Sequence, residues 1–400
     1  MKITNCTTYV VGNPPPYHGG PYFVFVKLTT DNNISGFGEV YGMPFGPHKV
    51  TELIDDTVER YVIDEDPFNI EKMWRVIYSS AYTQHPDLSI CGVLSGIEIA
   101  CWDIIGKSLG QPIYNLLGGQ VQEKLRSYTY MYPEEKQTHG GHLSISDAFN
   151  NPDIAPQRAM HYVDQGFTAI KLDPIMPMSA FDPRNLSLST LDNAEQVIKN
   201  IREAVGNQCD ILIGTHGQMT TSTAIRLAKR LEQFDPLWLE EPVPPENKKE
   251  MGRVAHSTTI PVATGERLVT KYEFAELLGH QAAAIIQPAL GRVGGILEAK
   301  KIAGMAEAHY VQIAPHLYCG PIEAAANIQI ATCSPNFLIQ ESIETFNGFY
   351  SEIIKTPINW DNGYIIPSKE PGLGVELDED VAKNNPYDGA IFPPMANTPL

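Results

Sequence analysis

Six residues with charged or proton-transferring side chains follow short apolar runs in the second half of the chain. They are Lys171, His216, Glu240, Glu266, His316 and Glu341, which stand in or at the end of the runs FTAIK, ILIGTH, LWLE, PVATGE, VQIAPH and FLIQE. Where the runs are consecutive, these residues lie roughly 25 positions apart, which is the length of one strand plus one helix. Side chains at the carboxyl ends of parallel strands meet at one end of a barrel, so we expect them to form one site.

The two carboxylates of this set suit a metal ion. Glu240 and Glu266 end adjacent predicted strands, close enough to share one cation. Hard oxygen ligands of this kind favour Mg²⁺, which keeps water and binds through one or two carboxylates plus substrate oxygens. The plainer alternative is that Glu240 or Glu241 is a solvated loop acid and that Glu266 pairs with Arg267.

The two histidines are candidates for proton transfer. His216 and His316 end the third and seventh predicted barrel strands, on opposite sides of the mouth, and imidazole exchanges protons near neutral pH. One could take the proton next to a substrate carboxylate while the other protonates a departing β-hydroxyl. The alternative is that each only hydrogen-bonds a loop, which is how we interpret the other histidines of the chain.

Three further charged residues have weaker indications. Lys171 and Asp173 share a strand face, so the lysine could balance the carboxylates or hold a substrate anion. Glu341 could hydrogen-bond a substrate. For Lys171 and Glu341 the alternatives are a salt bridge and a core ion pair without a catalytic role.

The elements that must position these residues can be read from the apolar pattern. Residues 22–41 predict a hairpin that turns at Asp31-Asn32-Asn33. The helical pattern of residues 67–117 closes on Gly110. From Leu125 the chain alternates apolar runs with helical segments, and about eight such units close a barrel. We therefore predict an α+β domain over residues 1–124 followed by a (β/α) barrel.

Composition limits the partners and the compartment. The chain has 400 residues and a net charge of −18, which argues against nucleic acid as a partner. No apolar run approaches the length of a membrane span or a signal sequence. The six cysteines have no CxxC spacing, so we expect reduced thiols and a cytoplasmic protein.

Several segments together resemble the enolase superfamily, and most closely its mandelate racemase subgroup of acid-sugar dehydratases, of the galactonate and mannonate type. The segments are SGIEIACWDIIGKSLGQPIYNLLGG, WLEEP, ATGER, GGILEAKKIAGMAEAH, IAPHLYCGPI and PGLGVEL. The resemblance implies a capping domain over a modified TIM barrel at residues 125–355. It also implies a C-terminal segment, residues 356–400, that packs back on the cap, and assembly into a homo-oligomer.

The resemblance also assigns roles to residues of this chain. Glu240 and Glu266 match the second and third Mg²⁺ ligands, His316 matches the acid/base of the seventh strand, and His216 matches the histidine of the third strand. Lys171 matches the first lysine of a Lys-x-Lys motif. His18 and Tyr82 belong to the cap, whose loops we expect to read the substrate.

Three positions depart from the pattern. Asp173 replaces the second lysine of the motif, and Ala289 replaces an aspartate that often partners the seventh-strand histidine. Gly214 occupies the position of the first metal ligand, which is normally a carboxylate. Either two carboxylates and additional water hold the ion, or Asp173 or His216 substitutes. We favour the first, because it leaves His216 free for chemistry, whereas a histidine ligand would favour a softer divalent metal.

The predicted function is dehydration of a sugar acid, an aldonate or aldarate, through an enediolate to a 2-keto-3-deoxy acid. An epimerase, racemase or cycloisomerase would use the same enediolate and the same two histidines. The alternative that is not an enzyme is a barrel that only binds sugar acids. Such a protein could lose carboxylates of the site, and Gly214 and Ala289 stand at positions where the family usually has one.

Overall fold

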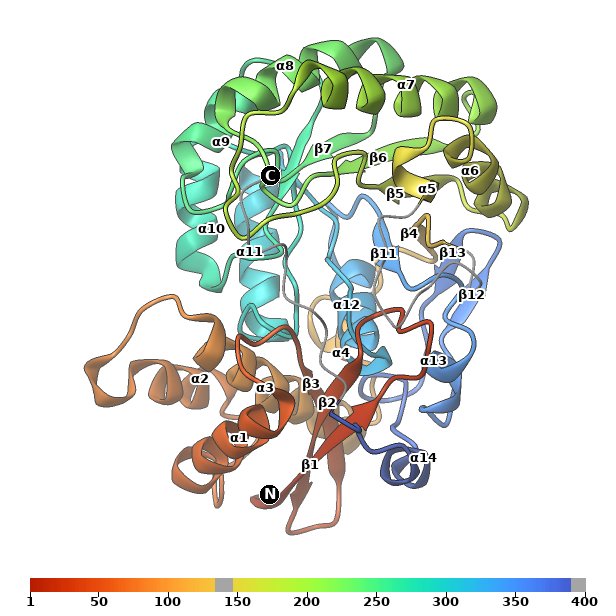
Figure 1. Ribbon diagram of the computed structural model, residues 1–400. Helices are drawn as coiled ribbons and strands as arrows, with labels where there is room; N and C mark the ends of the chain where they lie inside the picture. Colours follow the sequence, from red (N-terminus) through yellow and green to blue (C-terminus); the bar gives the residue numbers. More distant parts are fainter. Residues whose placement is uncertain (134–146, 390–400) are drawn as a thin grey trace.

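The structure is a computed structural model that describes residues 1–133 and 147–389. It has two parts, a small sheet flanked by three helices and a larger barrel of strands and helices above it (Figure 1). The predicted arrangement of an α+β cap on a modified TIM barrel is confirmed. The exact boundaries of the three predicted segments stay a prediction.

The cap is built on an antiparallel sheet of order β1-β2-β3. Its strands are β1 (Ile3–Gly12), β2 (Tyr22–Thr30) and β3 (Ser35–Val40), and its helices are α1 (Pro47–Tyr61), α2 (Ile70–Ser79) and α3 (Leu88–Leu109). The predicted hairpin turn joins β2 to β3, and Asn33 takes a positive φ of 62° there, a conformation that asparagine tolerates.

Helix α3 packs directly on β3. A Cβ at Gly38 would lie 1.8 Å from the carbonyl oxygen of Gly96 on α3, so glycine is required for this approach. The helix begins at the Asp87 side chain, which accepts hydrogen bonds from two backbone N–H groups, and it ends at Gly110 with φ 63°, as predicted.

The expectation that no segment could span a membrane needs a correction at this helix. Over the described residues, α3 alone is long and apolar enough, with a mean hydropathy of 1.7, but 78% of that window is buried inside the protein. Its apolar length is explained by packing on both sides, between the cap sheet and the barrel.

The barrel contains the eight predicted strands. They are β4 (Leu125–Tyr130), β5 (Ala169–Leu172), β6 (Asp210–Gly214), β7 (Trp238–Glu240), β8 (Val262–Thr264), β9 (Ile285–Ile286), β10 (Gln312–Ile313) and β11 (Gln340–Ser342). Consecutive strands pair in parallel from β4 to β10, and β11 pairs with β4. The Leu338 N–H donates to the Ile313 carbonyl at 2.9 Å, which brings β11 beside β10 and closes the barrel.

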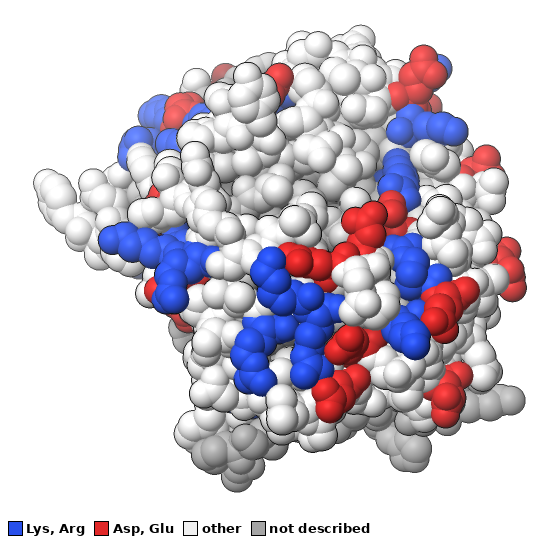
Figure 2. Space-filling model, turned by 90° about the horizontal axis from the view of Figure 1, so that it is seen from above, with Lys and Arg blue, Asp and Glu red and all other residues white. Residues whose placement is uncertain are grey.

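Helices surround the strands. They are α5 (Asp147–Asn150), α6 (Ala155–Asp164), α7 (Leu188–Val205), α8 (Thr221–Leu231), α9 (Lys248–Ala255), α10 (Thr270–Gly279), α11 (Ile296–Ala308) and α12 (Pro321–Thr332). On the face seen from above, basic and acidic side chains are mixed (Figure 2). Arg230 of α8 contacts Asp192 of α7 at 2.6 Å.

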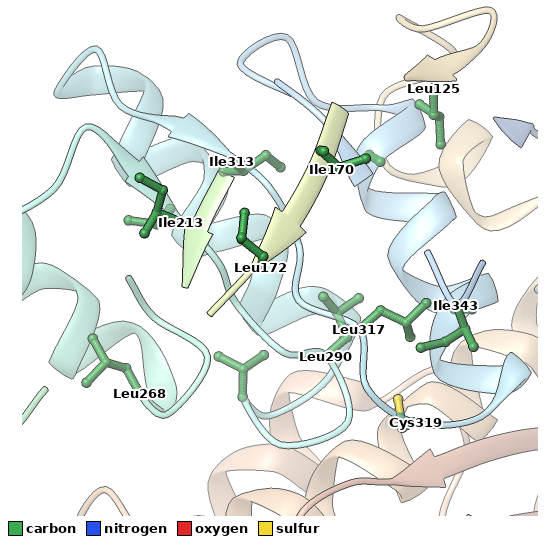
Figure 3. Packing of buried hydrophobic residues seen from close by; sticks show 14 of the residues in the cluster. Leu125, Ile170, Leu172, Ile213, Leu268, Leu290, Ile313, Leu317, Cys319 and Ile343 are labelled. Atoms are coloured by element: carbon green, nitrogen blue, oxygen red, sulfur yellow. The ribbon is translucent and has the colours of Figure 1, made fainter. Parts of the chain in front are cut away.

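Side chains alternate between the outside and the inside of the barrel. Ile170, Leu172 and Ile213 belong to the large apolar core between strands and helices (Figure 3). Leu212 and Trp238 belong to a smaller cluster inside the barrel. Because successive residues of a strand point to opposite faces, Lys171 lies inside the barrel between two outward-facing neighbours.

The last part of the chain joins the barrel to the cap. Strands β12 (Asn359–Asp361) and β13 (Tyr364–Ile366) extend the sheet beside β4, and the short helices α4 (Ile113–Leu116), α13 (Phe349–Glu352) and α14 (Glu379–Asn384) complete the fold. The Tyr9 hydroxyl of β1 donates to Oε2 of Glu379 at 2.5 Å. The C-terminal segment therefore contacts the cap sheet.

Candidate active site

A cavity of about 280 Å³ opens at the carboxyl end of the barrel strands. It is lined by Tyr41, Tyr130, Tyr132, Phe149, Lys171, Asp173, Met176, Met178, His216, Glu266, His316 and Tyr318. Five of these were expected to be site residues from the sequence. Tyr41 and Tyr318 also line a second cavity of about 600 Å³ between the cap loops, so the two cavities adjoin.

Lys171 is the buried cation of the site. Its side chain is 1% exposed, and Nζ lies 2.5 Å from Oε1 of Glu240 and 3.4 Å from Oε1 of Glu341. Burial disfavours the ammonium, but the charges of Glu240 and Glu341 raise the Lys171 pKa well above its usual value. The aromatic ring of Tyr130, 4.8 Å from Nζ, adds a cation–π contact. The salt bridge that we considered for Lys171 is present, and the residue also lines the cavity.

Both carboxylate oxygens of Glu240 accept hydrogen bonds from N–H donors. Its Oε1 accepts from Lys171, and its Oε2 accepts from the Trp238 indole at 2.9 Å and from the Gln287 amide at 2.8 Å. The side chain is not a solvated loop acid, because it lies buried inside the barrel. Trp238 and Gln287 were not predicted as site residues, although Trp238, two positions earlier on the same strand face, could have been noticed.

Glu341 lies beside the same ammonium. Its Oε2 accepts from the Leu317 backbone N–H at 2.8 Å. Burial raises the Glu341 pKa to about 7, partly opposed by Lys171. The core ion pair that we considered for this residue is therefore present, and hydrogen bonding to a substrate stays a prediction.

Glu266 is the glutamate that lines the cavity. Its Oε2 lies 3.5 Å from Nε2 of His316. Burial acts against the carboxylate, but His316, His216 and Lys171 together hold the Glu266 pKa well below its usual range. Arg267 does not pair with it, because its guanidinium contacts Glu241 at 2.6 Å.

His216 follows β6 in a tight turn, with a positive φ of 46°. The Thr215 hydroxyl fixes this turn to the next strand by donating to the carbonyl oxygens of Glu240 and Glu241, each at 2.8 Å. His216 Nδ1 then lies 3.0 Å from Oδ2 of Asp173, an ion-pair contact. Burial disfavours the imidazolium, but Asp173 and Glu266 raise the His216 pKa to about 10.

Asp173 is held between two partners. Besides His216, the Tyr130 hydroxyl donates to its Oδ1 at 3.2 Å. The carboxylate lines the cavity, so its predicted contact with substrate stays a prediction. The structure adds a contact that the sequence did not predict, since Asp173 and His216 come from neighbouring strands β5 and β6.

His316 has a different environment from His216. It is buried and stacks beside the Tyr41 ring, with 5.3 Å between the ring centroids. Its Nδ1 has no hydrogen-bond partner among the residues that the structure describes. Burial is the main cause that lowers the His316 pKa to about 3, and Arg292 and Lys171 add to it while Glu266 opposes it.

The two cap residues that were predicted to contact substrate, His18 and Tyr82, lie at different distances from the cavity. His18 stacks on Tyr132, a cavity residue, at 4.0 Å, and its Nδ1 lies 3.5 Å from Glu344. Tyr82 does not reach the cavity, because its side chain is 99% exposed at the end of a short 3-10 turn, residues Ser80–Tyr82. Within one chain the predicted substrate contact of Tyr82 is therefore not supported.

The carboxylates can be judged as ligands for a divalent cation. In residues 1–133 and 147–389, no three His, Cys, Asp or Glu side chains gather tightly enough to hold a metal ion. A cation does stand among the acids, however, because Lys171 contacts Glu240 and Glu341 and lowers the Glu266 pKa. Glu240 and Glu266 offer the hard oxygen donors that suit Mg²⁺. Both Glu240 oxygens already accept hydrogen bonds from Lys171, Trp238 and Gln287, so Glu240 fits such an ion only if donors such as Lys171 release it.

Comparison with known proteins places this chain in a family. Residues 19–118 match the mandelate racemase / muconate lactonizing enzyme N-terminal domain, and residues 155–381 match the enolase C-terminal domain-like family. A crystal structure from Labrenzia alexandrii DFL-11, assigned to the mandelate racemase/muconate lactonizing enzymes, is 56% identical with a TM-score of 0.95, covering 100% of this chain and 99% of that chain.

The relatives of this chain include named enzymes. A D-galactonate dehydratase of Xanthomonas euvesicatoria is 35% identical over 97% of this chain and 96% of its own length. A D-gluconate/D-galactonate dehydratase of Picrophilus torridus is 35% identical over 97% of this chain and 95% of its own length.

Proposed function

We propose that this chain, which belongs to the mandelate racemase and muconate lactonizing enzyme family of the enolase superfamily, removes water from a sugar acid. It is a carbon–oxygen lyase of the acid-sugar dehydratase type. The dehydratases among its relatives act on gluconate or galactonate, so the expected substrate is an aldonate or aldarate.

One observation carries the mechanism: two histidines from opposite sides of the barrel line one cavity, and only one of them has a close carboxylate at Nδ1. His216 lies 3.0 Å from Asp173, whereas His316 Nδ1 has no partner among the described residues and Ala289 stands where a carboxylate could have been. A carboxylate partner stabilises an imidazolium. His216 is therefore suited to give a proton and His316 to accept one.

The proposed reaction balances without an added reagent. Neutral His316 takes the proton from the carbon next to the substrate carboxylate, which leaves an enediolate. The electron pair then moves to form the carbon–carbon double bond as the β-hydroxyl departs, and His216 supplies the proton that turns this hydroxyl into water. The resulting enol becomes the 2-keto-3-deoxy acid.

The charge that develops on the substrate carboxylate must be stabilised. Members of this superfamily generally use Mg²⁺, and we assign Glu240 and Glu266 as the residues that would hold it. When bound, such an ion lowers the energy of the enediolate by neutralising its charge. Lys171, which is a lining residue of the cavity, attracts the anionic substrate from the protein side.

A screen of acid-sugar diastereomers tests the proposal. Each sugar acid is incubated with protein and MgCl₂, and semicarbazide detects any 2-keto-3-deoxy acid that forms. Turnover of at least one aldonate or aldarate is expected, and it should be lost in Glu266→Gln. If no member of the panel is turned over while the protein still binds sugar acids, the chain is a binding protein and the dehydratase assignment is wrong.

The expected compartment and partners of the protein follow from the same assignment. A cytoplasmic enzyme of sugar-acid breakdown needs neither membrane nor nucleic acid as a partner, and its small-molecule substrate is its main ligand. Assembly into a homo-oligomer stays a prediction, which sedimentation of the purified chain can test.

A further inference from the structure

The space above Gly214 is filled by a carboxylate from the neighbouring strand. A Cβ built on Gly214 would lie 2.0 Å from Oδ1 of Asp173 and 3.1 Å from the hydroxyl oxygen of Tyr130. The first distance is far below any carbon–oxygen contact that a folded protein tolerates. Residue 214 can therefore carry a side chain only if the Asp173 carboxylate moves.

Glycine at this position is needed for space and not for backbone conformation. Gly214 is the last residue of β6 and pairs in regular parallel register with Glu240 of β7. Gly217, three residues later, has a positive φ of 72°, whereas Gly214 is not among the residues with positive φ. An alanine could adopt the same backbone at 214, so the conflict lies with the Asp173 oxygen.

The Asp173 carboxylate is held by contacts on both of its oxygens. Its side chain is 6% exposed, and its two oxygens are used by different groups, Oδ1 by the Tyr130 hydroxyl and Oδ2 by His216 Nδ1. Tyr130 is itself held by the Lys171 ammonium, 4.8 Å from its ring centroid. A methyl group at 214 would thus push the carboxylate out of its contact with His216.

We propose that Asp173 is the positioning residue of His216, and that residue 214 is glycine because the Asp173 carboxylate occupies the space of its side chain. The carboxylate orients the ring through Nδ1, which leaves Nε2 for the substrate. The usual carboxylate of this position is thereby replaced by one that serves a histidine. The inference rests on the proposed function only in taking His216 as the proton donor.

Other titratable groups near His216 come from several strands of the barrel. Lys171 comes from β5, Glu241 follows β7, Glu266 follows β8 and His316 follows β10. Lys171 disfavours a charged His216, and Glu266 favours it. Among the charged side chains that the structure describes, Asp173 is the one in direct contact with the ring, so its removal should change His216 more than removal of any of the others.

The test measures the imidazole of His216 directly, without substrate or metal. Protein labelled at the histidine Cε1 is titrated by NMR, and the His216 signal is assigned by its loss in His216→Gln. The variants are Asp173→Asn, which keeps the shape but removes the charge, and Gly214→Ala, which keeps both partners. Gly304→Ala is the matched control, because a Cβ at Gly304 meets nothing within 4 Å.

In the unaltered protein, the His216 signal should titrate far above the ordinary histidine range. In Asp173→Asn and in Gly214→Ala its midpoint should fall by about 1 to 3 pH units, whereas Gly304→Ala should leave it in place. In the enzymatic reaction, the pH at which kcat/KM declines on the alkaline side should move down in the same two variants.

Two results would overturn the inference. One is a His216 midpoint in the ordinary range in the unaltered protein, a measurement that needs no variant to fold. The other is an unchanged midpoint in a folded Asp173→Asn or Gly214→Ala protein. Because the titration uses no substrate, it gives its answer even if the dehydratase screen is negative, so the two proposals fail separately.

Discussion

Nζ of Lys171 lies 2.5 Å from Oε1 of Glu240, and both side chains are almost fully buried at the mouth of the barrel. The pair brings a strand-β5 cation and a strand-β7 carboxylate together beneath the cavity. Because Glu341 lies on the other side of the same ammonium, one lysine neutralises two buried acids, and the site depends on it for stability as well as for charge.

Replacing Lys171 by methionine should destabilise the protein strongly. The change leaves Glu240 and Glu341 buried without their cation, and removal of one partner of a buried ion pair typically costs about 3 to 5 kcal/mol. Urea unfolding of purified protein measures the difference. Lys49→Met is the control, because its pair with Glu52 is exposed and should contribute less than about 1 kcal/mol. A loss for Lys171→Met no larger than for the control would contradict this description of the pair.

Binding of a divalent cation should depend on the two glutamates. Calorimetric titration with MgCl₂ is expected to show one site per chain, weakened at least about tenfold, or 1.4 kcal/mol, in Glu266→Gln and in Glu240→Gln. Glu59→Gln, at an exposed position of α1, should bind as the unaltered protein does. Equal affinity in all four proteins would show that these glutamates are not the ligands, and no binding at all would favour a barrel without metal chemistry.

The two histidines should divide the reaction between them. His316→Asn should lose exchange of the C2 hydrogen with solvent by about 10²- to 10⁴-fold, because it lacks the group that accepts this proton. His216→Gln should keep the exchange but release little keto acid. Proton NMR of the substrate in deuterated buffer follows both processes. If His216→Gln loses exchange and His316→Asn keeps it, the two roles are reversed.

The contact between strand β3 of the cap sheet and helix α3 can be tested by a substitution at Gly38. Alanine at Gly38 would place a Cβ 1.8 Å from the Gly96 carbonyl oxygen, and such overpacking typically destabilises by about 1 to 3 kcal/mol. Gly279→Ala, where the added carbon meets nothing within 4 Å, is the matched control and should be neutral or slightly stabilising. Thermal unfolding compares the two, and equal Tm values would show that the sheet and helix can separate at no cost.

The sequence predicted much of this architecture because strand alternation and strand–helix spacing are local properties. Once Ile170 and Leu172 are assigned to the outer face, Lys171 must face inward. The same regularity brings His216 and His316 to one mouth from strands β6 and β10.

Other features depend on distances between strands, which spacing along the chain does not contain. That the Asp173 oxygen fills the space above Gly214 could not be seen from either residue alone. The donors to Glu240, namely Trp238 and Gln287, come from different strands. Tyr82 was expected near the substrate because it belongs to the cap, but its local turn directs the side chain to solvent.

NMR analysis of the product formed in D₂O from a turned-over sugar acid tests dehydration itself. We expect a 2-keto-3-deoxy acid with one solvent deuterium at carbon 3, because the β-hydroxyl departs as water and the enol is protonated from solvent. A sugar acid of inverted configuration at carbon 2, with deuterium there and an intact hydroxyl at carbon 3, formed in place of any keto acid, would contradict dehydration and identify an epimerase.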